Sequence, residues 1–413
     1  MLAKLKSFLT YRNLILANLI VLAFKIIYLV FVQKEFGGLE DFTIAKNIVQ
    51  YHQYSEFIDQ GGTAFKLPVY PFCMAIFIWL FGDNALFGLA IFQAILSFSI
   101  PILIYKTVRL FGLGKTGITA GFLFLLSPAY FLYPGNMEAT NVFVPILLFW
   151  FYLYFRIWFS LENKNLDFII FGVVTAFLFL TQVVIVPLSG LMILALLIFK
   201  KANFKNFSYL VLTIVLLYSP WIIRNYYVFD KFVPSKTPTW QNIYYGFTEN
   251  GQLLDDLKLI SKERDHELYQ TRDENSELVM EDIYKNEVKK VTHFEPHFFI
   301  KKAMSNFFCL WFVPPKYFDD NSLSVLLGRK MYVLVINLLT LISLIFIYRK
   351  SKIMFWFSLL FIANFSFPYM IGHANNIRFK LDFEWFQLIL IAYLLAELYK
   401  YYQQKNVPRF RNV

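Results

Sequence analysis

Long apolar runs recur along the whole chain, and they restrict the fold more than any other feature of the sequence. Hydrophobic residues make up 58% of the 413 residues, whereas only 16% are charged, and the charges collect in short segments between the runs. A bilayer offers no water to backbone polar groups, and an α-helix of roughly 20 residues satisfies those groups across a hydrocarbon core of about 30 Å. The sequence therefore predicts an all-α, polytopic membrane protein.

The basic residues predict how the chain crosses the membrane. Lysine and arginine are enriched in cytoplasmic loops, and 39 basic against 28 acidic residues give a net charge of +11. This distribution predicts a multi-pass protein of the plasma (inner) membrane with both termini in the cytoplasm. About ten transmembrane helices are expected, near residues 13–32, 85–105, 117–133, 141–158, 167–183, 186–199, 207–223, 330–348, 353–371 and 384–399.

Two polar stretches are expected outside the cytoplasm. The first external loop covers residues 34–82, and its short apolar run, 67–81, is interpreted as a juxtamembrane or re-entrant helix because a full span would place a basic segment outside. The second stretch, 226–313, alternates in charge like solvated amphipathic helices and ends in a helix, 297–313, expected to lie on the membrane surface. No internal repeat or linker divides the chain, so residues 1–413 are predicted to form a single membrane domain.

The first external loop carries two adjacent carboxylates, Glu40 and Asp41. Apolar residues follow at helical spacing, at Ile44, Ala45, Ile48 and Val49. This pattern predicts a short helix along the membrane surface with the acidic pair at its start. The pair suits that helix terminus by itself, as an N-cap or as a favourable charge. A carboxylate in this place could also act as a base at the boundary between water and lipid.

Four cations lie at predicted outer ends of spans, where topology alone does not favour them: Lys66, Arg224, Arg378 and Lys380. The last two fall in GHANNIRFKLDFE, which is expected to be an external loop. Such residues often extend their charge to the interface without further role. Cations at headgroup depth also suit a lipid phosphate or pyrophosphate, since arginine offers a planar fork to phosphate oxygens. With the acidic pair on the same side, the set suits displacement of a lipid phosphate by a deprotonated hydroxyl.

No cofactor is predicted. The two cysteines lie far apart, the five histidines show no ligand spacing, and the first loop has no DxD motif, although the acidic pair could still reach a divalent cation. The basic excess is explained by topology, and no nucleic-acid-binding motif is present. One charge, Lys25, is expected within a span.

Several short motifs follow the acidic pair in a fixed order: KLPVYPFCMAIFIWLFG, LSPAYFLYPGNMEATNVF, SPWIIRNYYVFDKFVPSKT and IRFKLDFEWFQLILIAYLL. In this order the chain resembles the GT-C glycosyltransferases, in particular the bacterial branch similar to dolichyl-phosphate-mannose protein mannosyltransferases and lipid A aminoarabinose transferases. The resemblance implies the GT-C fold and an inverting transfer of a sugar from a polyprenyl-phosphate donor to a hydroxyl of a glycan, lipid or protein acceptor on the extracytoplasmic side.

The resemblance also implies roles for particular residues. Asp41 or Glu40 takes the place of the family's base. The family's donor-phosphate residues correspond to Lys66, Arg224 and Arg378, to which we add Lys380. Supporting roles are expected for Tyr70, Glu138, Asn225 and His373.

Two positions depart from the family pattern. Asp382 stands where the family commonly has proline, and Gln182 stands where it often has arginine. Two other functions stay open: a polymerase or ligase of lipid-linked oligosaccharides, and a lipid or solute transporter. A transporter would need broken helices and paired charges at the bilayer midplane, where Lys25 is the one expected charge.

Overall fold

The computed structural model describes residues 9–33, 35–37, 39–313, 322–374 and 377–406. Within these residues almost all regular structure is α-helical, and the only β pairing is an isolated bridge between Thr248 and Ile260. The predicted all-α membrane fold is confirmed, because several of the helices are long and apolar enough to cross a bilayer.

Six segments of the described chain meet that requirement, and the number rises to eight if each of two bent helix pairs is one span. The predicted count of ten is therefore not confirmed. The six are α2 (Tyr11–Phe31), α4 (Val69–Phe81) continued into α5 (Ala85–Leu110), α8 (Thr140–Phe159), α11 (Phe204–Phe229), α16 (Leu323–Lys350) and α17 (Lys352–Ile371).

The bent pairs explain part of the difference in count. α6 (Gly114–Leu125) meets the segment Pro128–Gly135, which contains α7 (Pro128–Leu132), at 62°. α9 (Asn165–Phe179) meets the segment Val183–Ile198, which contains α10 (Val186–Ile198), at 119°. A proline lies within the first two residues of both α7 and α10. Proline favours a helix start and disfavours continuation from the helix before it, so the chain turns there.

The last helix, α18 (Ile377–Asn406), is not among the candidate spans, and it corrects one prediction. Residues 377–384 were expected in an external loop, but they form its first turns, where Lys380, Asp382 and Glu384 are buried. Burial is tolerated because each of these charges has polar partners on neighbouring helices, as described below. The expectation of one buried charge is also wrong: Lys25 is buried, with its Nζ 2.8 Å from Ser97 Oγ, but it is joined by these three residues.

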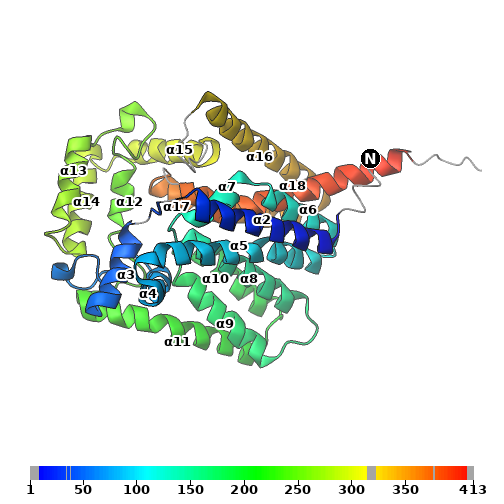
Figure 1. Cartoon of the computed structure of the whole chain (residues 1–413), viewed down its shortest axis with the longest axis horizontal. Coiled ribbons are helices and arrows are strands. Elements are labelled where there is room, and N and C mark those ends of the chain that lie inside the picture. Colours follow the sequence, from blue (N-terminus) through cyan, green and yellow to red (C-terminus); the bar gives the residue numbers. More distant parts are fainter. Residues whose placement is uncertain (1–8, 34, 38, 314–321, 375–376, 407–413) are drawn as a thin grey trace, which may run out of the picture.

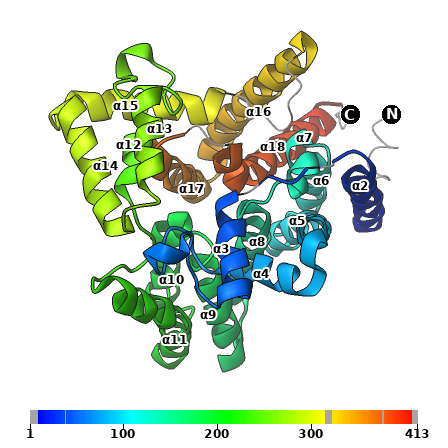
Figure 2. The same cartoon turned by 60° about the vertical axis from the view of Figure 1, so that its left-hand side comes forward.

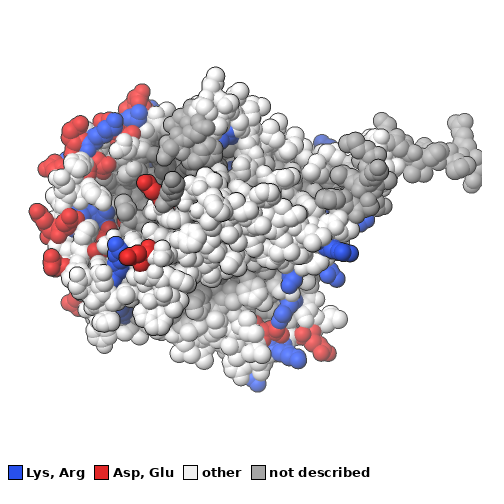
Figure 3. Space-filling view, in the orientation of Figure 1, with Lys and Arg blue, Asp and Glu red and all other residues white. Residues whose placement is uncertain are grey.

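The long helices run roughly alongside one another, and the polar helices gather at one end of the bundle (Figure 1). α2 begins and α18 ends at the opposite end. On the face shown in Figure 3, charges of both signs crowd the end formed by α12–α14, basic side chains dominate near the other end, and a broad belt with few charges lies between them. This is the surface expected of a protein that crosses a bilayer.

Four helices follow α11 and hold the polar segment together. They are α12 (Trp240–Tyr245), α13 (Lys262–Thr271), α14 (Glu277–Thr292) and α15 (Pro296–Phe312). The first three enclose a hydrophobic cluster of their own, which includes Tyr244, Phe247 and Leu268. α15 confirms the helix predicted at 297–313 and is amphipathic. It exposes Ile300, Met304, Phe308 and Phe312 at four-residue spacing, and it buries Lys302 and Asn306.

Near the polar helices lies α3 (Leu39–Tyr51), which packs on α4 (Figure 2). It confirms the helix predicted after the acidic pair, and both Glu40 and Asp41 lie in its first turn. Ile44 and Ala45 are fully buried, so the apolar stripe anchors α3 and fixes the direction in which its first turn points.

Candidate active site

A cavity of about 810 Å³ lies where the first loop, the polar segment and the α17–α18 connection meet. Six of the ten predicted site residues line it: Glu40, Asp41, Lys66, Tyr70, His373 and Arg378. Residues from α12, α13, the α9–α10 turn and the end of α17 complete the wall. The fold thus brings together side chains that lie more than 300 residues apart in the sequence.

The acidic pair shares one lysine. Lys66 Nζ lies 2.6 Å from Glu40 Oε2 and 3.9 Å from Asp41 Oδ2, and the lysine also lies over the ring of Phe65. A second cation, Arg272 of the α13–α14 turn, approaches Glu40 at 3.9 Å and pairs with Glu56 at 2.7 Å. Glu40 is therefore held between two cations, whereas Asp41 has only the more distant contact.

The two carboxyl groups consequently differ in pKa. Asp41 is 7% exposed, and burial raises its pKa above the usual range, although Lys66 and Arg378 partly oppose that effect. Burial also acts to raise the pKa of Glu40, but the combined charges of Lys66, Arg272 and Arg378 outweigh it and leave the pKa lowered. At neutral pH a carboxylate with a raised pKa accepts a proton more readily, so Asp41 is the stronger base of the two.

Lys236 also lines the cavity and was missed in the sequence analysis. It has no hydrogen bond or ion pair within the described part of the chain, and its side chain is exposed to the cavity. The surrounding protein atoms reduce the hydration of the ammonium group, and this desolvation, together with the positive charges of Arg378 and Lys66, lowers the pKa of Lys236 to about 8. It lies in the motif SPWIIRNYYVFDKFVPSKT, but the charged external stretch that begins at residue 226 gave no reason to single it out.

Arg378 approaches the cavity from the first turn of α18. Its Nη1 lies 2.8 Å from Glu138 Oε2, which places the predicted supporting residue Glu138 directly behind it. The guanidinium also lies over the ring of Phe379, 5.4 Å from the centroid. Arg378 is thereby fixed by two neighbours while its side chain still contributes to the cavity wall.

Arg224 and Asn225 do not line the cavity, but they hold segments that do. Arg224 donates from Nη1 to Thr63 O at 2.6 Å and from Nη2 to Tyr54 O at 2.8 Å. Asn225 donates to Val233 O at 3.0 Å. The first two bonds fasten the loop that leads to Lys66, and the third fastens the turn that leads to Lys236.

Gly62 permits this contact of Arg224 with the first loop. A Cβ at residue 62 would lie 2.5 Å from Arg224 Nη2, so any larger residue would displace the guanidinium. The predicted contact of Arg224 with a donor phosphate stays a prediction.

The remaining predicted residues have separate surroundings. Lys380 lies away from the cavity, with Nζ 3.2 Å from Asn337 Oδ1 and above the ring of Trp311. Its contact with a phosphate likewise stays a prediction. Tyr70 donates its hydroxyl to Gln93 Oε1 at 2.8 Å. His373 has a buried Nδ1 without a partner among the described residues, and burial beside Arg378, Lys236 and Lys302 lowers its pKa to about 3.

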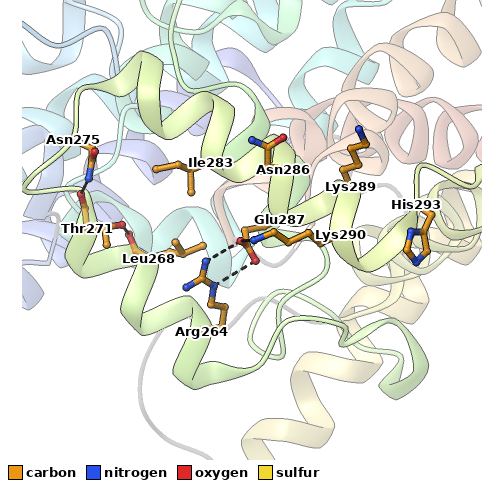
Figure 4. Close-up of a pocket in the computed structure, with 10 residues that line it drawn as sticks. All are labelled: Arg264, Leu268, Thr271, Asn275, Ile283, Asn286, Glu287, Lys289, Lys290 and His293. Carbon is orange, nitrogen blue, oxygen red and sulfur yellow. Dashed lines mark hydrogen bonds and ion pairs between the residues drawn. The ribbon is translucent and has the colours of Figure 1, made fainter.

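A second hollow, a groove between α13 and α14, is also lined by charges (Figure 4). There the carboxylate of Glu287 accepts from Arg264 Nη2 at 2.8 Å and from Lys290 Nζ at 2.7 Å. The acid is thus fully compensated, and both cations have solvent-exposed side chains. The larger cavity has unequal carboxylates and a lysine, Lys236, without an ion pair to any described residue, and it is the better candidate for catalysis.

No group of three or more histidine, cysteine, aspartate or glutamate side chains within the described residues is placed to hold a metal ion. The acidic pair of the cavity is instead occupied by cationic side chains.

Residues 65–223 match the family model described as dolichyl-phosphate-mannose-protein mannosyltransferase. No curated protein matches the chain. The matched segment is less than half of the chain; it includes Lys66, Tyr70 and Glu138 and begins after the acidic pair. Residues 65–223 are therefore similar to the dolichyl-phosphate-mannose-protein mannosyltransferases, a family of the GT-C superfamily of membrane glycosyltransferases.

Proposed function

We propose that this membrane glycosyltransferase moves a sugar from a polyprenyl-phosphate donor to an acceptor hydroxyl, with inversion at the anomeric carbon, in the cavity beneath α12–α14. In this proposal the cavity faces the extracytoplasmic side of the plasma (inner) membrane, and both termini are cytoplasmic. The first external loop, 34–82, carries the active site, and the segment 226–313 covers it within a single membrane domain. The acceptor is a glycan, a lipid or a protein.

The observation that carries the proposal is the unequal acidic pair. Asp41 is buried, has a raised pKa and lies 3.9 Å from Lys66, while Glu40 is committed to Lys66 and Arg272. Asp41 therefore removes the proton of the acceptor hydroxyl, and Glu40 orients Lys66. The sequence left the choice between the two acids open, and their different surroundings favour Asp41.

The cations of the cavity serve the leaving group. The acceptor oxygen attacks the anomeric carbon from the face opposite the phosphate, and the bond from that carbon to the phosphate oxygen breaks with its electron pair. Negative charge grows on the departing polyprenyl phosphate, and Lys66, Lys236 and Arg378 line the cavity that receives it. Fixed cations in a partly dehydrated site stabilise such a transition state more than the ground state.

The test uses purified protein in lipid nanodiscs with a radiolabelled polyprenyl-phosphate hexose and crude membrane lipid and glycan as acceptors. Release of polyprenyl phosphate is followed for the wild type, Asp41→Asn and Glu40→Gln. Removal of a general base and its charge is expected to cost on the order of 10³-fold for Asp41→Asn, and Glu40→Gln should retain more activity.

A fully active Asp41→Asn protein would contradict the assignment of the base. If the wild type releases no polyprenyl phosphate but does release polyprenyl pyrophosphate from a pyrophosphate-linked oligosaccharide, the polymerase or ligase function replaces the proposed one. Movement of the lipid-linked sugar across a bilayer without cleavage would support the transporter.

A further inference from the structure

One wall of the cavity carries a hydrogen-bond chain that ends on a buried carboxylate. Gln182 and Tyr369 line the cavity, and both connect to Asp382, which is fully buried behind the wall. Tyr369 Oη lies 3.0 Å from Asp382 Oδ2, and Thr140 Oγ1 lies 2.9 Å from Asp382 Oδ1. Gln182 Nε2 reaches Thr140 Oγ1 at 3.4 Å. The residues come from α8, the α9–α10 turn, α17 and α18, so the network joins four parts of the fold.

Burial raises the pKa of Asp382 to about 7, and the ionised form of this residue sets the direction of every bond in the chain. Each oxygen of Asp382 accepts a hydrogen bond, so the hydroxyls of Tyr369 and Thr140 both point their hydrogens away from the cavity. Because Thr140 Oγ1 already donates its hydrogen to Asp382, it can only accept from Gln182. The amide nitrogen of Gln182 therefore points toward Thr140, and its carbonyl oxygen is left as an acceptor. On the cavity side the Tyr369 oxygen is thus left as an acceptor, and Gln182 keeps its carbonyl oxygen and one N–H for a ligand.

Aromatic rings continue the same wall. Tyr369 stacks on Phe379 with ring centroids 3.9 Å apart, Phe379 meets His373 at 5.4 Å, and His373 meets Tyr245 at 4.9 Å. All four side chains line the cavity. His373 is neutral near pH 7 because its pKa is lowered to about 3. The wall is thus a run of rings with hydrogen-bond acceptors beside it, adjacent to the cationic residue Arg378.

We propose that this wall is the subsite for the sugar of the donor, and that it selects an uncharged, hydroxyl-bearing sugar over a uronic acid. Asp382 is the positioning residue of the subsite, acting through Tyr369 and Thr140. The inference rests on the proposed function and deepens it. The apolar faces of a pyranose pack on aromatic rings, and its hydroxyls donate to the acceptor oxygens of Tyr369 and Gln182. A sugar carboxylate would face those same acceptors, while the cations of the cavity, Lys66, Lys236 and Arg378, are occupied by the donor phosphate.

Two variants test the polarity of the wall. In Asp382→Asn one oxygen becomes an N–H donor, so Tyr369 or Thr140 must reverse its hydrogen, and the wall gains a donor. Tyr369→Phe deletes one acceptor and leaves the carboxylate in place. We expect each to raise the KM for polyprenyl-phosphate glucose about tenfold with less change in kcat, as loss of one substrate hydrogen bond implies. Asp382→Asn should also lower the preference for glucose over glucuronate.

The same helix offers matched controls. Glu384 is another buried carboxylate of α18, and it accepts from Tyr332 Oη at 2.7 Å, but neither residue lines the cavity. Tyr332→Phe and Glu384→Gln remove the same groups as the two test variants. They should leave the ratio of kcat/KM for the two donors unchanged even if they lower thermal stability.

The experiment measures kcat/KM for polyprenyl-phosphate glucose and polyprenyl-phosphate glucuronate with all five proteins. A wild-type preference for glucose that falls in Asp382→Asn and not in the controls supports the subsite. Equal use of both donors by the wild type, or an unchanged ratio in both test variants, overturns it while leaving the glycosyltransferase proposal standing. Release of polyprenyl phosphate from neither donor defeats the proposed function and the subsite together. If Asp382→Asn does not fold, Tyr369→Phe decides through its KM.

Discussion

Two lysine–glutamate pairs of nearly equal geometry have very different surroundings. Lys66 Nζ lies 2.6 Å from Glu40 in the cavity, and Lys290 Nζ lies 2.7 Å from Glu287 in the groove between α13 and α14. The side chain of Lys66 is 19% exposed, whereas that of Lys290 is 66% exposed. The distance between the charges therefore does not distinguish the two sites.

The difference lies in how the charges around each pair are balanced. In the groove, Arg264 joins Lys290 on one buried carboxylate, and water screens the two cations. In the cavity, Lys66 is shared by two carboxylates, Asp41 keeps a raised pKa, and Lys236 has no ion pair within the described residues. Charges that line a cavity and are incompletely paired with one another remain available to a substrate, whereas a pair with a saturated carboxylate and solvent-exposed cations contributes little.

The largest expected effect separates these two lysines directly. Lys66→Met should reduce release of polyprenyl phosphate by on the order of 10²- to 10³-fold, because it removes a fixed cation from the leaving group and frees Glu40. Lys290→Met should leave release within about twofold and change the free energy of unfolding by less than about 1 kcal/mol. Steady-state release and thermal unfolding of both variants check this contrast.

Comparable loss of activity in the two variants would mean that the groove, and not only the cavity, takes part in transfer. If both variants were about as active as the wild type, Lys66 would not stabilise the transition state. Lys66→Arg serves as a further variant, since it keeps the charge but changes its shape.

Much of the fold followed from the sequence because apolar periodicity reports burial directly. The runs predicted helices at 13–32, 141–158 and 353–371, close to α2, α8 and α17. The short apolar run at 67–81 also predicted a short helix in the first loop, close to α4. The predicted spans and the candidate spans of the structure differ where proline broke a run and where α18 buried its charged first turns. In both places the outcome depends on which partners lie opposite in space, and a single chain does not show them.

The sequence predicted those site residues whose charge was unexpected at their position relative to the membrane. Glu40, Asp41, Lys66 and Arg378 broke the expected charge pattern, and the fold brings them to one cavity. Lys236 and Arg272 lie in a segment already rich in charge, so nothing in the sequence separated them from ordinary solvated residues. The role of Asp382 depends on Thr140 and Tyr369, which are distant in sequence and individually unremarked.

A smaller effect is expected from pH, and it sharpens the contrast between Asp41 and Lys236. The proposed mechanism requires Asp41 in its ionised form, so kcat/KM should fall as pH drops through the raised pKa of Asp41. Transfer is also favoured by charged Lys236, so kcat/KM should fall again as pH rises past about 8. Each limb should approach a tenfold change per pH unit if its group is essential.

Lys236→Arg tests the assignment of the alkaline limb. An arginine stays protonated throughout this range, so the limb should move to higher pH while the acid limb stays in place. An alkaline limb that is identical in Lys236→Arg would assign it to another group. The profile of kcat should show the limb at higher pH than that of kcat/KM, because a bound phosphate stabilises the charged lysine.

The smallest expected effect compares two glutamates of α14 that differ in the same way as the two lysines. The carboxylate of Glu277 accepts from the Thr63 hydroxyl and from Ala64 N at 3.0 Å, and burial raises its pKa to about 7. Hydrogen bonds from Arg264 and Lys290 instead lower the pKa of Glu287. Glu277 thus joins the polar segment to the first loop, while Glu287 remains in the groove.

The signs of the two contributions are opposite. The folded state holds a proton on Glu277 more tightly than the unfolded chain does, so this contribution to stability is full below the unfolded pKa near 4.5 and is lost as pH rises through about 7. The loss is on the order of 3 kcal/mol at most. The contribution of Glu287 is present above its unfolded pKa and is lost only at lower pH, so it is flat between pH 5 and 8. We expect wild-type thermal stability to decrease over that range.

Glu277→Gln should flatten this decrease, because a neutral amide has no proton to lose, whereas Glu287→Gln should lower stability without changing its slope with pH. A wild-type slope that persists in Glu277→Gln would transfer the effect to Glu56, whose pKa burial also raises to about 7 beside Arg272. That outcome would still place the pH-sensitive contact between the polar segment and the first loop. The contact would then involve Arg272, which also approaches Glu40, and not α14. The two glutamine variants therefore decide whether the pH-sensitive contact between the polar segment and the first loop lies at Glu277 or at the pair of Glu56 and Arg272.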